Sequence, residues 1–289
     1  MRVLLTGWAS FRHGEATAGD VLSLRAVSDV LTEAGVDHLT AWSPAFRPEG
    51  PHLDDAEPDA FTHIVFACGP LRGTQLHELH RRYPRSRRLA VGVSVPDPAD
   101  PAVTGFDVVL PRDDGDACAA DLSLATRVES PPVVGVVLAP DQPEYGADRR
   151  HETVHTTLAA WLRDLDCGRV PLDTRLATDD WRHCATPDQF VSTLSRLDVL
   201  VSTRLHGLAL GLKAGVPVLA VDPVAHGGKV TAQATALRWP AVLPADATRA
   251  DLDKWFEWCC SAEARARAAA EHPFPGPLAE LVGALEEMP

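Results

Sequence analysis

An arginine and a histidine occupy what the sequence predicts to be the first turn of a helix, in the segment Ser202-Thr203-Arg204-Leu205-His206. The two hydroxyl residues favour the capping position before a helix. The first turn has unpaired N–H groups and the positive end of the helix dipole, so cations there are unfavourable unless an anion neutralises them. We therefore predict an anion-binding turn with Arg204 as its main contact.

Each of these two side chains also suits a purely structural role, and the sequence alone leaves both roles open. Arg204 would equally suit an ion pair with a nearby carboxylate, and His206 would equally suit a place in the core. The site is favoured because both residues follow a predicted parallel strand, and open α/β sheets bind ligands at the carboxyl ends of their strands. A histidine that titrates near neutral pH also suits proton transfer, which makes His206 a candidate general acid or base.

A further cation follows the next predicted strand. Gly215 ends the helix that begins at Arg204, and an apolar run leads from there to Asp222. The stretch that follows contains Gly227-Gly228, where the backbone can approach a ligand closely, and then Lys229. Lys229 is a second candidate anion contact; a solvated lysine in a surface loop is the alternative.

The elements that must position these residues are short apolar runs alternating with amphipathic helical segments. This rhythm predicts an α/β protein with mostly parallel sheets covered on both faces. The Pro131-Pro132 pair divides it into two Rossmann-like lobes, 1–130 and 131–289. We predict strands at 2–7, 63–67, 89–95, 107–110, 133–138, 199–202 and 216–221, and helices at 20–34, 151–165, 187–196, 204–214, within 248–270, and at 277–287.

Composition excludes several classes of function. The chain has 289 residues and a formal net charge of −13, which disfavours nucleic acid and anionic membrane as partners. Its six cysteines form no C-x-x-C pair and no zinc-ligand spacing, so we expect reduced thiols, no metal and no cofactor. The first apolar run is too short for a signal peptide, and no run is long enough to span a membrane. We therefore expect a cytoplasmic protein.

The motif resembles the signature of the polysaccharide pyruvyl transferase family. That signature has a strand, a Ser-x-Arg-x-His turn, an apolar helix, Ala-Gly-x-Pro, a second strand and a later lysine, which correspond here to 202–222 and Lys229. Weaker matches extend over most of the chain. They are Gly19-Asp20 before the first helix, Cys68-Gly69-Pro70 after a strand, Arg112-Asp113, and Asp121.

This resemblance implies a fold similar to GT-B glycosyltransferases, with C-terminal helices packing back on the first lobe. It implies transfer of a pyruvyl group from phosphoenolpyruvate to two hydroxyls of a sugar or glycan, as a ketal, in cell-surface glycan biosynthesis. The first lobe would serve the acceptor and the second the donor. Catalytic roles would fall to His206 and Asp20, although Asp20 equally suits a helix cap. Substrate contacts would come from Ser202, Arg204, Leu205, Lys229 and Gly19.

The chain departs from the family pattern at two places. Thr17 stands where the family has Asn before Gly-Asp, and no arginine follows the strand that ends at Leu138. Arg149 and Arg150 are the nearest substitutes in sequence for the missing arginine. Two other functions therefore stay open: a GT-B-type glycosyltransferase that uses a nucleotide sugar, and a non-catalytic family member that binds a small molecule.

Overall fold

A computed structural model describes residues 1–289 except 14, 115–116, 141, 272–275 and 287–289. The chain divides into two compact units, Met1–Glu129 and Ser130–Pro289, and each has its own sheet and core. The predicted boundary between residues 130 and 131 lies one residue beyond this division. The assignment of one lobe to an acceptor and the other to a donor stays a prediction.

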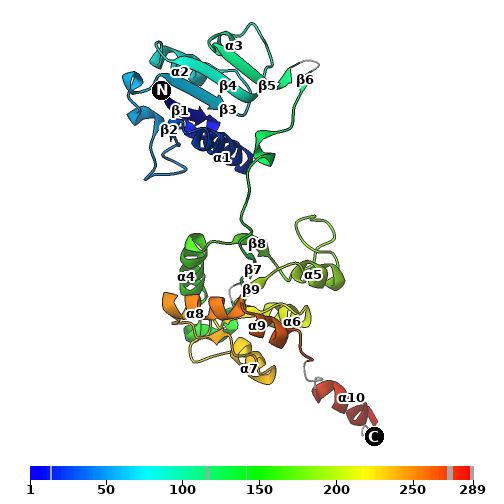
Figure 1. The fold of residues 1–289 in the computed structure, drawn as a ribbon. Coiled ribbons are helices and arrows are strands. Elements are labelled where there is room, and N and C mark those ends of the chain that lie inside the picture. The colour runs from blue at the N-terminus through cyan, green and yellow to red at the C-terminus, as the bar shows by residue number, and fades with distance from the viewer. Residues whose placement is uncertain (14, 115–116, 141, 272–275, 287–289) are drawn as a thin grey trace. The chain divides into compact units, whose positions relative to one another are not determined.

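The first unit is a parallel sheet with helices on both faces (Figure 1). Its strands follow the order β2-β1-β3-β4-β5-β6, and only the short β6 runs antiparallel to its neighbour. The elements are β1 (Arg2–Gly7), α1 (Ala18–Glu33), β2 (Asp37–Thr40), β3 (His63–Ala67), α2 (Thr74–Arg82), β4 (Arg87–Ser94), α3 (Pro101–Thr104), β5 (Val108–Asp114) and β6 (Ala117–Cys118).

Alternation along the central strands separates the core of this unit into two layers. Leu4 and Phe66 belong to the cluster that contains the buried residues of α2 and α3. Their neighbours Leu5 and Val65 belong to the other cluster, which contains Leu24 of α1. Since successive side chains of a strand point to opposite faces, the continuous apolar runs of β1 and β3 are what a sheet covered on both sides requires.

The second unit repeats this architecture. Its five strands are all parallel, in the order β11-β10-β9-β7-β8. The elements are β7 (Val133–Val137), α4 (His151–Asp164), β8 (Gly168–Leu172), α5 (Pro187–Leu194), β9 (Val199–Ser202), α6 (Leu205–Lys213), β10 (Val218–Val221), α7 (Lys229–Ala236), β11 (Val242–Leu243), α8 (Arg249–Cys259), α9 (Ala262–Ala268) and α10 (Gly276–Glu286).

When strands are numbered within each unit, the first five strands have the same order in both, with the first strand in the interior and the second at one edge. The order reverses between β1 and β3 in the first unit and between β7 and β9 in the second. Such a switch point leaves a crevice at the carboxyl ends of its two strands, where doubly wound sheets bind their ligands. The predicted fold class, two Rossmann-like α/β lobes, is confirmed.

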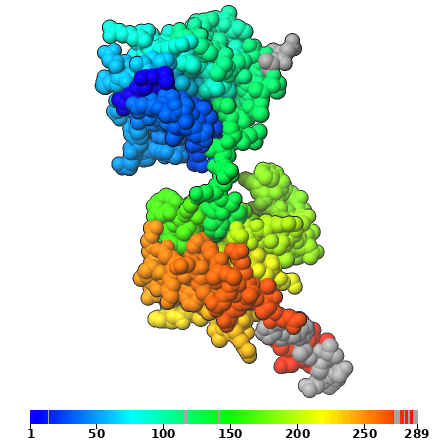
Figure 2. Space-filling view, in the orientation of Figure 1, coloured from blue at the N-terminus to red at the C-terminus, as the bar shows by residue number. Residues whose placement is uncertain are grey.

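The C-terminal helices α8 and α9 belong to the core of the second unit. Phe256 of α8 lies 5.6 Å from the ring of Trp161 of α4, and the Trp161 indole N–H donates to Asp253 at 2.7 Å. The surface of α8 and α9, orange in the space-filling view, is continuous with the rest of this unit (Figure 2). A contact of the C-terminal helices with the first lobe stays a prediction.

Most predicted elements lie within two residues of the observed ones, and the predicted strands 2–7, 63–67 and 199–202 match completely. The predicted helical tail within 248–270 consists of two helices, α8 and α9, because Ser261 caps a new helix. All six cysteines are free thiols. No helix in the described part of the chain combines the length and the apolar character that crossing a membrane requires.

Candidate functional site

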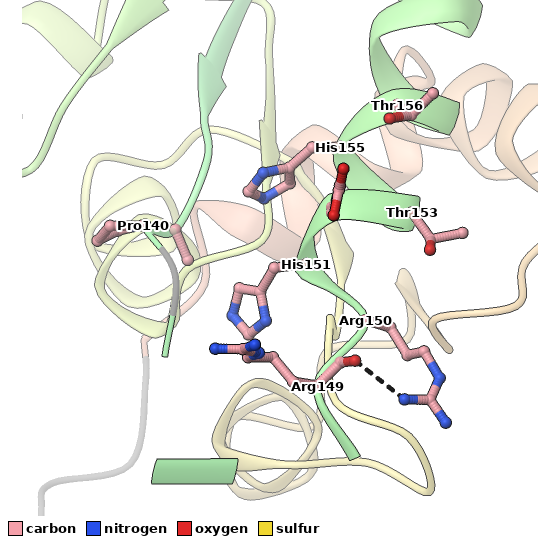
Figure 3. A pocket seen from close by; sticks show the side chains of 9 residues that line it. Pro140, Arg149, Arg150, His151, Thr153, His155 and Thr156 are labelled. Carbon is pink, nitrogen blue, oxygen red and sulfur yellow. Dashed lines mark hydrogen bonds between the residues drawn. The ribbon is translucent and has the colours of Figure 1, made fainter. Parts of the chain in front are cut away.

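A cavity of about 530 Å³ lies at the switch point of the second unit. It opens beside Ala139 and Pro140, which follow β7, and beside the first turns of α4 (Figure 3). Parallel strands and the helix that follows bring backbone N–H groups and the positive helix end to this place. The residues that line it are Ala139, Pro140, Arg149, Arg150, His151, Glu152, Thr153, His155 and Thr156.

Basic side chains dominate this cavity. His151 and His155 are one helical turn apart, and with Arg149 they lie on the side of α4 that faces Pro140, whereas Arg150 lies on the other side (Figure 3). His151 is buried, and its Nε2 lies 3.2 Å from the side-chain oxygen of Gln142. Among the described residues that line the cavity, two arginines and two histidines accompany the carboxylate of Glu152, a set that suits an anionic ligand.

Thr203 connects this cavity to the predicted anion-binding turn. Its buried hydroxyl oxygen accepts the Ala139 N–H at 2.7 Å and lies 3.3 Å from His155 Nε2. A hydroxyl has one O–H and two lone pairs, so Thr203 can still donate to His155 or accept from it, according to the tautomer of the ring. Burial, and then the neighbouring His151, lower the pKa of His155, so the neutral ring is favoured until an anion arrives.

The turn itself differs from its prediction in the capping residue. Arg204, not Ser202 or Thr203, is the N-cap of α6, and no side chain caps the helix. The Ser202 hydroxyl instead accepts the Arg204 N–H at 3.0 Å and donates to the Arg204 carbonyl at 3.1 Å. The predicted capping was wrong because this local pair of hydrogen bonds competes with capping. Ser202 thus supports the turn from its buried side, and a substrate contact by Ser202 stays a prediction.

Close packing holds α6 against the sheet at this turn. A Cβ on Gly207 would collide with Ser202 Oγ, and a Cβ on Gly211 would lie 2.6 Å from Val218. Glycine at these two positions therefore allows the helix start to lie directly on the end of β9. Leu205, the first helical residue, is half-buried there.

The Arg204 side chain makes an ion pair with Asp173, which follows β8. Arg204 Nη1 lies 3.0 Å from Asp173 Oδ1, and the two side chains are 28% and 43% exposed. The Asp173 carboxylate neutralises Arg204, which is what a structural role for the arginine requires. The pair lies at the surface, however, so an anionic ligand can replace the carboxylate. His206 is exposed, so the alternative of a histidine in the core is wrong.

Lys229 lies in a separate loop that Asp222 organises. The Asp222 carboxylate is fully buried and accepts four hydrogen bonds, from the N–H groups of Val224, Gly228 and Thr231 and from the Thr231 hydroxyl. Lys229 begins α7, and its Nζ lies 3.8 Å from Glu144 Oε1. A substrate contact by Lys229 stays a prediction.

The same loop is joined to the rim of the cavity. The Arg150 N–H donates to the Pro223 carbonyl at 2.8 Å, and the Ala225 N–H donates to the Asp148 carbonyl at 2.8 Å. These bonds fix the segment that carries Arg149 and Arg150 against the loop after β10. The two arginines that are the nearest substitutes for the missing family arginine therefore line the cavity from the segment just before α4.

Gly19 and Asp20 belong to the first unit. Thr17 is the N-cap of α1, and Asp20 completes a capping box, with its carboxylate 2.7 Å from the Thr17 hydroxyl. Asp20 therefore takes part in capping the helix, which is the structural alternative to catalysis. It does so from the third helical position, while Thr17 is the N-cap itself. Gly19 is exposed in the first turn. Their predicted roles toward an acceptor stay predictions.

The other first-unit residues of the motif matches gather at the carboxyl ends of β3 to β5. Arg112 Nη1 donates to Asp121 at 2.6 Å, and Arg112 Nη2 donates to Ser94 at 2.8 Å. Cys68 has a positive φ of 68° directly after β3, and burial is the main cause that raises the pKa of its thiol. This polar cluster is held together by its own contacts.

Sequence reasoning missed His151, His155 and Asp173 as members of the site. The pair of histidines at i and i+4 and the arginines before them are a signal that was available in the sequence. Asp173 carries no such signal, since only the pairing of β7 with both β8 and β9 brings it to Arg204. Among the described residues, no group of three or more His, Cys, Asp or Glu side chains is arranged to hold a metal ion.

Comparisons with solved structures give low similarity over nearly the whole chain. MurG of Acinetobacter baumannii is 13% identical, with 99% of each chain covered and a TM-score of 0.35. The spinosyn rhamnosyltransferase SpnG, complexed with thymidine diphosphate, is 13% identical, with 99% of this chain and 100% of that chain covered and a TM-score of 0.34. The E. coli heptosyltransferase WaaC with ADP is 11% identical, with 93% and 99% covered and a TM-score of 0.28. Similarity at this level carries no conclusion about function.

A comparison with curated proteins gives no significant match. The model of one protein family matches residues 169–223, from β8 to the loop after β10. That segment contains Asp173 and the turn from Ser202 to His206, whereas Lys229 and the first-unit residues lie outside it. The resemblance that the motif indicates is confirmed over this segment, which matches the family of polysaccharide pyruvyl transferases.

Proposed function

We propose that the protein is a transferase that moves a pyruvyl group from phosphoenolpyruvate to two hydroxyls of a sugar or glycan, forming a ketal. One observation supports this most: a cavity lined by two arginines and two histidines lies at the switch point, next to the Arg204 turn that the family match includes. Thr203 joins the two features through its contacts with Ala139 and His155.

Phosphoenolpyruvate carries two anionic groups, and the second unit offers two groups of cations. In the proposed complex the Arg204 guanidinium binds the carboxylate in a two-pronged hydrogen-bonded pair, replacing Asp173. The phosphate enters the cavity beside Arg149 and the N-terminus of α4, where helix N–H groups and His155 can donate to it. Arg149 thereby takes the place of the arginine that is missing after Leu138.

The reaction needs one proton to be added and two hydroxyl protons to be removed. A general acid protonates the methylene carbon, the first sugar hydroxyl adds to the neighbouring carbon, and the second hydroxyl then displaces phosphate. The products are the ketal and inorganic phosphate, which leaves with one of the hydroxyl protons. We assign His206 to the proton transfer because it is exposed in the same turn as Arg204 and an imidazole can both give and take a proton.

The test is calorimetric binding of phosphoenolpyruvate, followed by release of inorganic phosphate with candidate glycans. Arg204→Ala should weaken phosphoenolpyruvate binding by about tenfold or more, the scale of a lost charged hydrogen bond, with folding nearly intact. Arg163→Ala is the matched control, since Arg163 lies at the other end of α4 and is 75% exposed. Binding of nucleotide sugars with no binding of phosphoenolpyruvate would contradict the proposal in favour of a glycosyltransferase.

A further inference from the structure

The loop between β8 and α5, residues 173–186, stands away from the sheet beside α5 (Figure 1). It contributes little to the core, yet its own contacts hold it in shape. The Ala177 N–H donates to the Cys184 carbonyl at 3.1 Å, and Arg175 contacts the ring of His183. Arg182 makes two side-chain hydrogen bonds to Asp180, at 2.9 and 3.0 Å. The loop is therefore a preformed feature of the second unit.

Trp181 in this loop is 92% exposed. The other six tryptophans of the chain are buried or half-buried, mostly in aromatic clusters. An indole ring is a large apolar surface with one polar N–H, and such rings gather at binding surfaces where one face meets a partner. A loop that is held by its own contacts and keeps this ring in water is thus arranged for an external ligand with a flat apolar face.

The same loop encloses a hollow of about 520 Å³. The residues that line it include Arg175, Leu176, Thr178, Asp179 and Asp180, and Trp181 follows directly after Asp180 in the chain. Small-molecule sites combine apolar surface with a few polar groups in this way. The residues of the hollow include hydrogen-bond donors and acceptors and carry both positive and negative charge. Asp180 is already paired with Arg182. The hollow therefore favours a neutral ligand rich in hydroxyl groups.

We infer that loop 173–186 is a sugar-binding subsite in which Trp181 stacks on the apolar face of a pyranose ring and the polar side chains of the hollow bind its hydroxyls. This inference rests on the proposed function, for which it assigns residues to the acceptor. The loop begins at Asp173, the partner of Arg204, so the subsite and the anion-binding turn belong to the same unit and are joined at this residue.

The contrast with the switch-point cavity supports the assignment to a sugar ring. Among the described residues, that cavity is lined by arginines and histidines and by no other aromatic ring. The loop offers the exposed indole of Trp181 and a hollow with side chains of both charges. Electrostatics therefore favours the anionic donor in the switch-point cavity and leaves the loop to the uncharged acceptor.

The test uses the full chain and saturation-transfer NMR with the methyl glycosides of glucose, galactose, mannose and N-acetylglucosamine. At least one should bind with saturation transfer to its ring C–H groups. Trp181→Ala should weaken it by about fivefold or more, and Trp181→Phe should retain most of the affinity, because an aromatic face remains. Leu110→Ala, which removes an exposed apolar side chain of the first unit, is the matched control and should change nothing.

Three results would overturn the inference. They are equal glycoside affinity in Trp181→Ala, quenching of tryptophan fluorescence by uridine or adenosine monophosphate in the wild type but not in Trp181→Ala with no glycoside binding, and a wild-type dimer in sedimentation that Trp181→Ala dissociates. Phosphoenolpyruvate affinity is measured on the same samples. Glycoside binding that depends on Trp181 without phosphoenolpyruvate binding would end the proposed function and leave the sugar subsite standing.

Discussion

Replacing Asp173 by alanine tests whether Arg204 is a ligand contact or only one half of a structural ion pair. In the absence of ligand the Asp173 carboxylate lies 3.0 Å from the Arg204 guanidinium. An anion that binds Arg204 must first displace this carboxylate. Removing it should therefore strengthen anion binding, whereas removing a residue that positions the ligand would weaken it.

The size of the gain follows from the exposure of the pair. The two side chains are 28% and 43% exposed, so water and salt screen their attraction. Pairs of this kind contribute about 0.2 to 1 kcal/mol. Since about 1.4 kcal/mol corresponds to a tenfold change in affinity, Asp173→Ala should bind phosphoenolpyruvate roughly 1.4- to 5-fold more tightly.

The assay is isothermal titration of phosphoenolpyruvate and of inorganic phosphate at low and at physiological salt. Asp173→Asn keeps the shape of the side chain and should show a similar gain, which declines as salt rises. Asp188→Ala is the matched control, because it removes an exposed carboxylate from the first turn of α5 without a contact to Arg204.

A double-mutant cycle gives the decisive comparison. When Arg204 is already alanine, Asp173→Ala should change anion affinity only slightly, since the competing pair no longer exists. Weaker binding in Asp173→Ala alone would show that the carboxylate orders the site for its ligand. An equal gain in anion affinity with and without Arg204 would mean that Asp173 acts only through the overall surface charge. Either result would refute the displacement of Asp173 by a ligand.

Three further predictions concern catalysis and stability. His206→Asn should lower turnover by about a hundredfold or more while donor affinity and melting temperature change little, since the exposed ring supplies a proton and no packing; thermal unfolding and phosphate release on one sample check this. Asp222→Asn should lower the unfolding free energy by about 2 to 3 kcal/mol, which urea denaturation measures. The buried carboxylate accepts hydrogen bonds from backbone N–H groups, whereas the amide would direct its own N–H donors toward some of them. The pKa of His155 is lowered in the folded protein, so the unfolded chain binds more protons just below the usual imidazole value of about 6.5, and stability falls as pH falls through that range. His155→Gln should flatten this part of the pH profile in urea titrations, and saturating phosphate should do the same in the wild type by raising that pKa; an unchanged slope in both would contradict the assignment.

Local patterns in the sequence determined the elements whose residues bury themselves almost completely. The strands 2–7, 63–67 and 199–202 are continuous apolar runs, and such runs have few other ways to hide from water than the interior of a parallel sheet. Gly35 and Gly215 mark helix ends because both take the positive φ that glycine allows, at 67° and 74°. The division into two units also follows from the proline pair.

Elements that bury few of their own residues have weak apolar patterns and escaped prediction. β8 is a short edge strand that contains Arg169 and Pro171, and α2 buries only Leu76 and Leu79 among mostly polar residues. Their stability comes from neighbours that the sheet supplies rather than from their own composition. Local patterns therefore could not separate them from loops.

The candidate site divides along the same line. The turn from Ser202 to His206 lies within five consecutive residues, so its chemistry was readable from the sequence, although its capping residue was not. The partner of Arg204 lies 31 residues away, and Thr203 meets His155 across 48 residues. Only the order of β8, β7 and β9 in the sheet brings these groups together, because strand pairing depends on contacts distant in sequence while helix and strand patterns depend on neighbours. The sequence by itself determined the elements with strong apolar patterns and the cationic turn. The tertiary structure decided that a carboxylate pairs with Arg204 and that a histidine-lined cavity adjoins the turn.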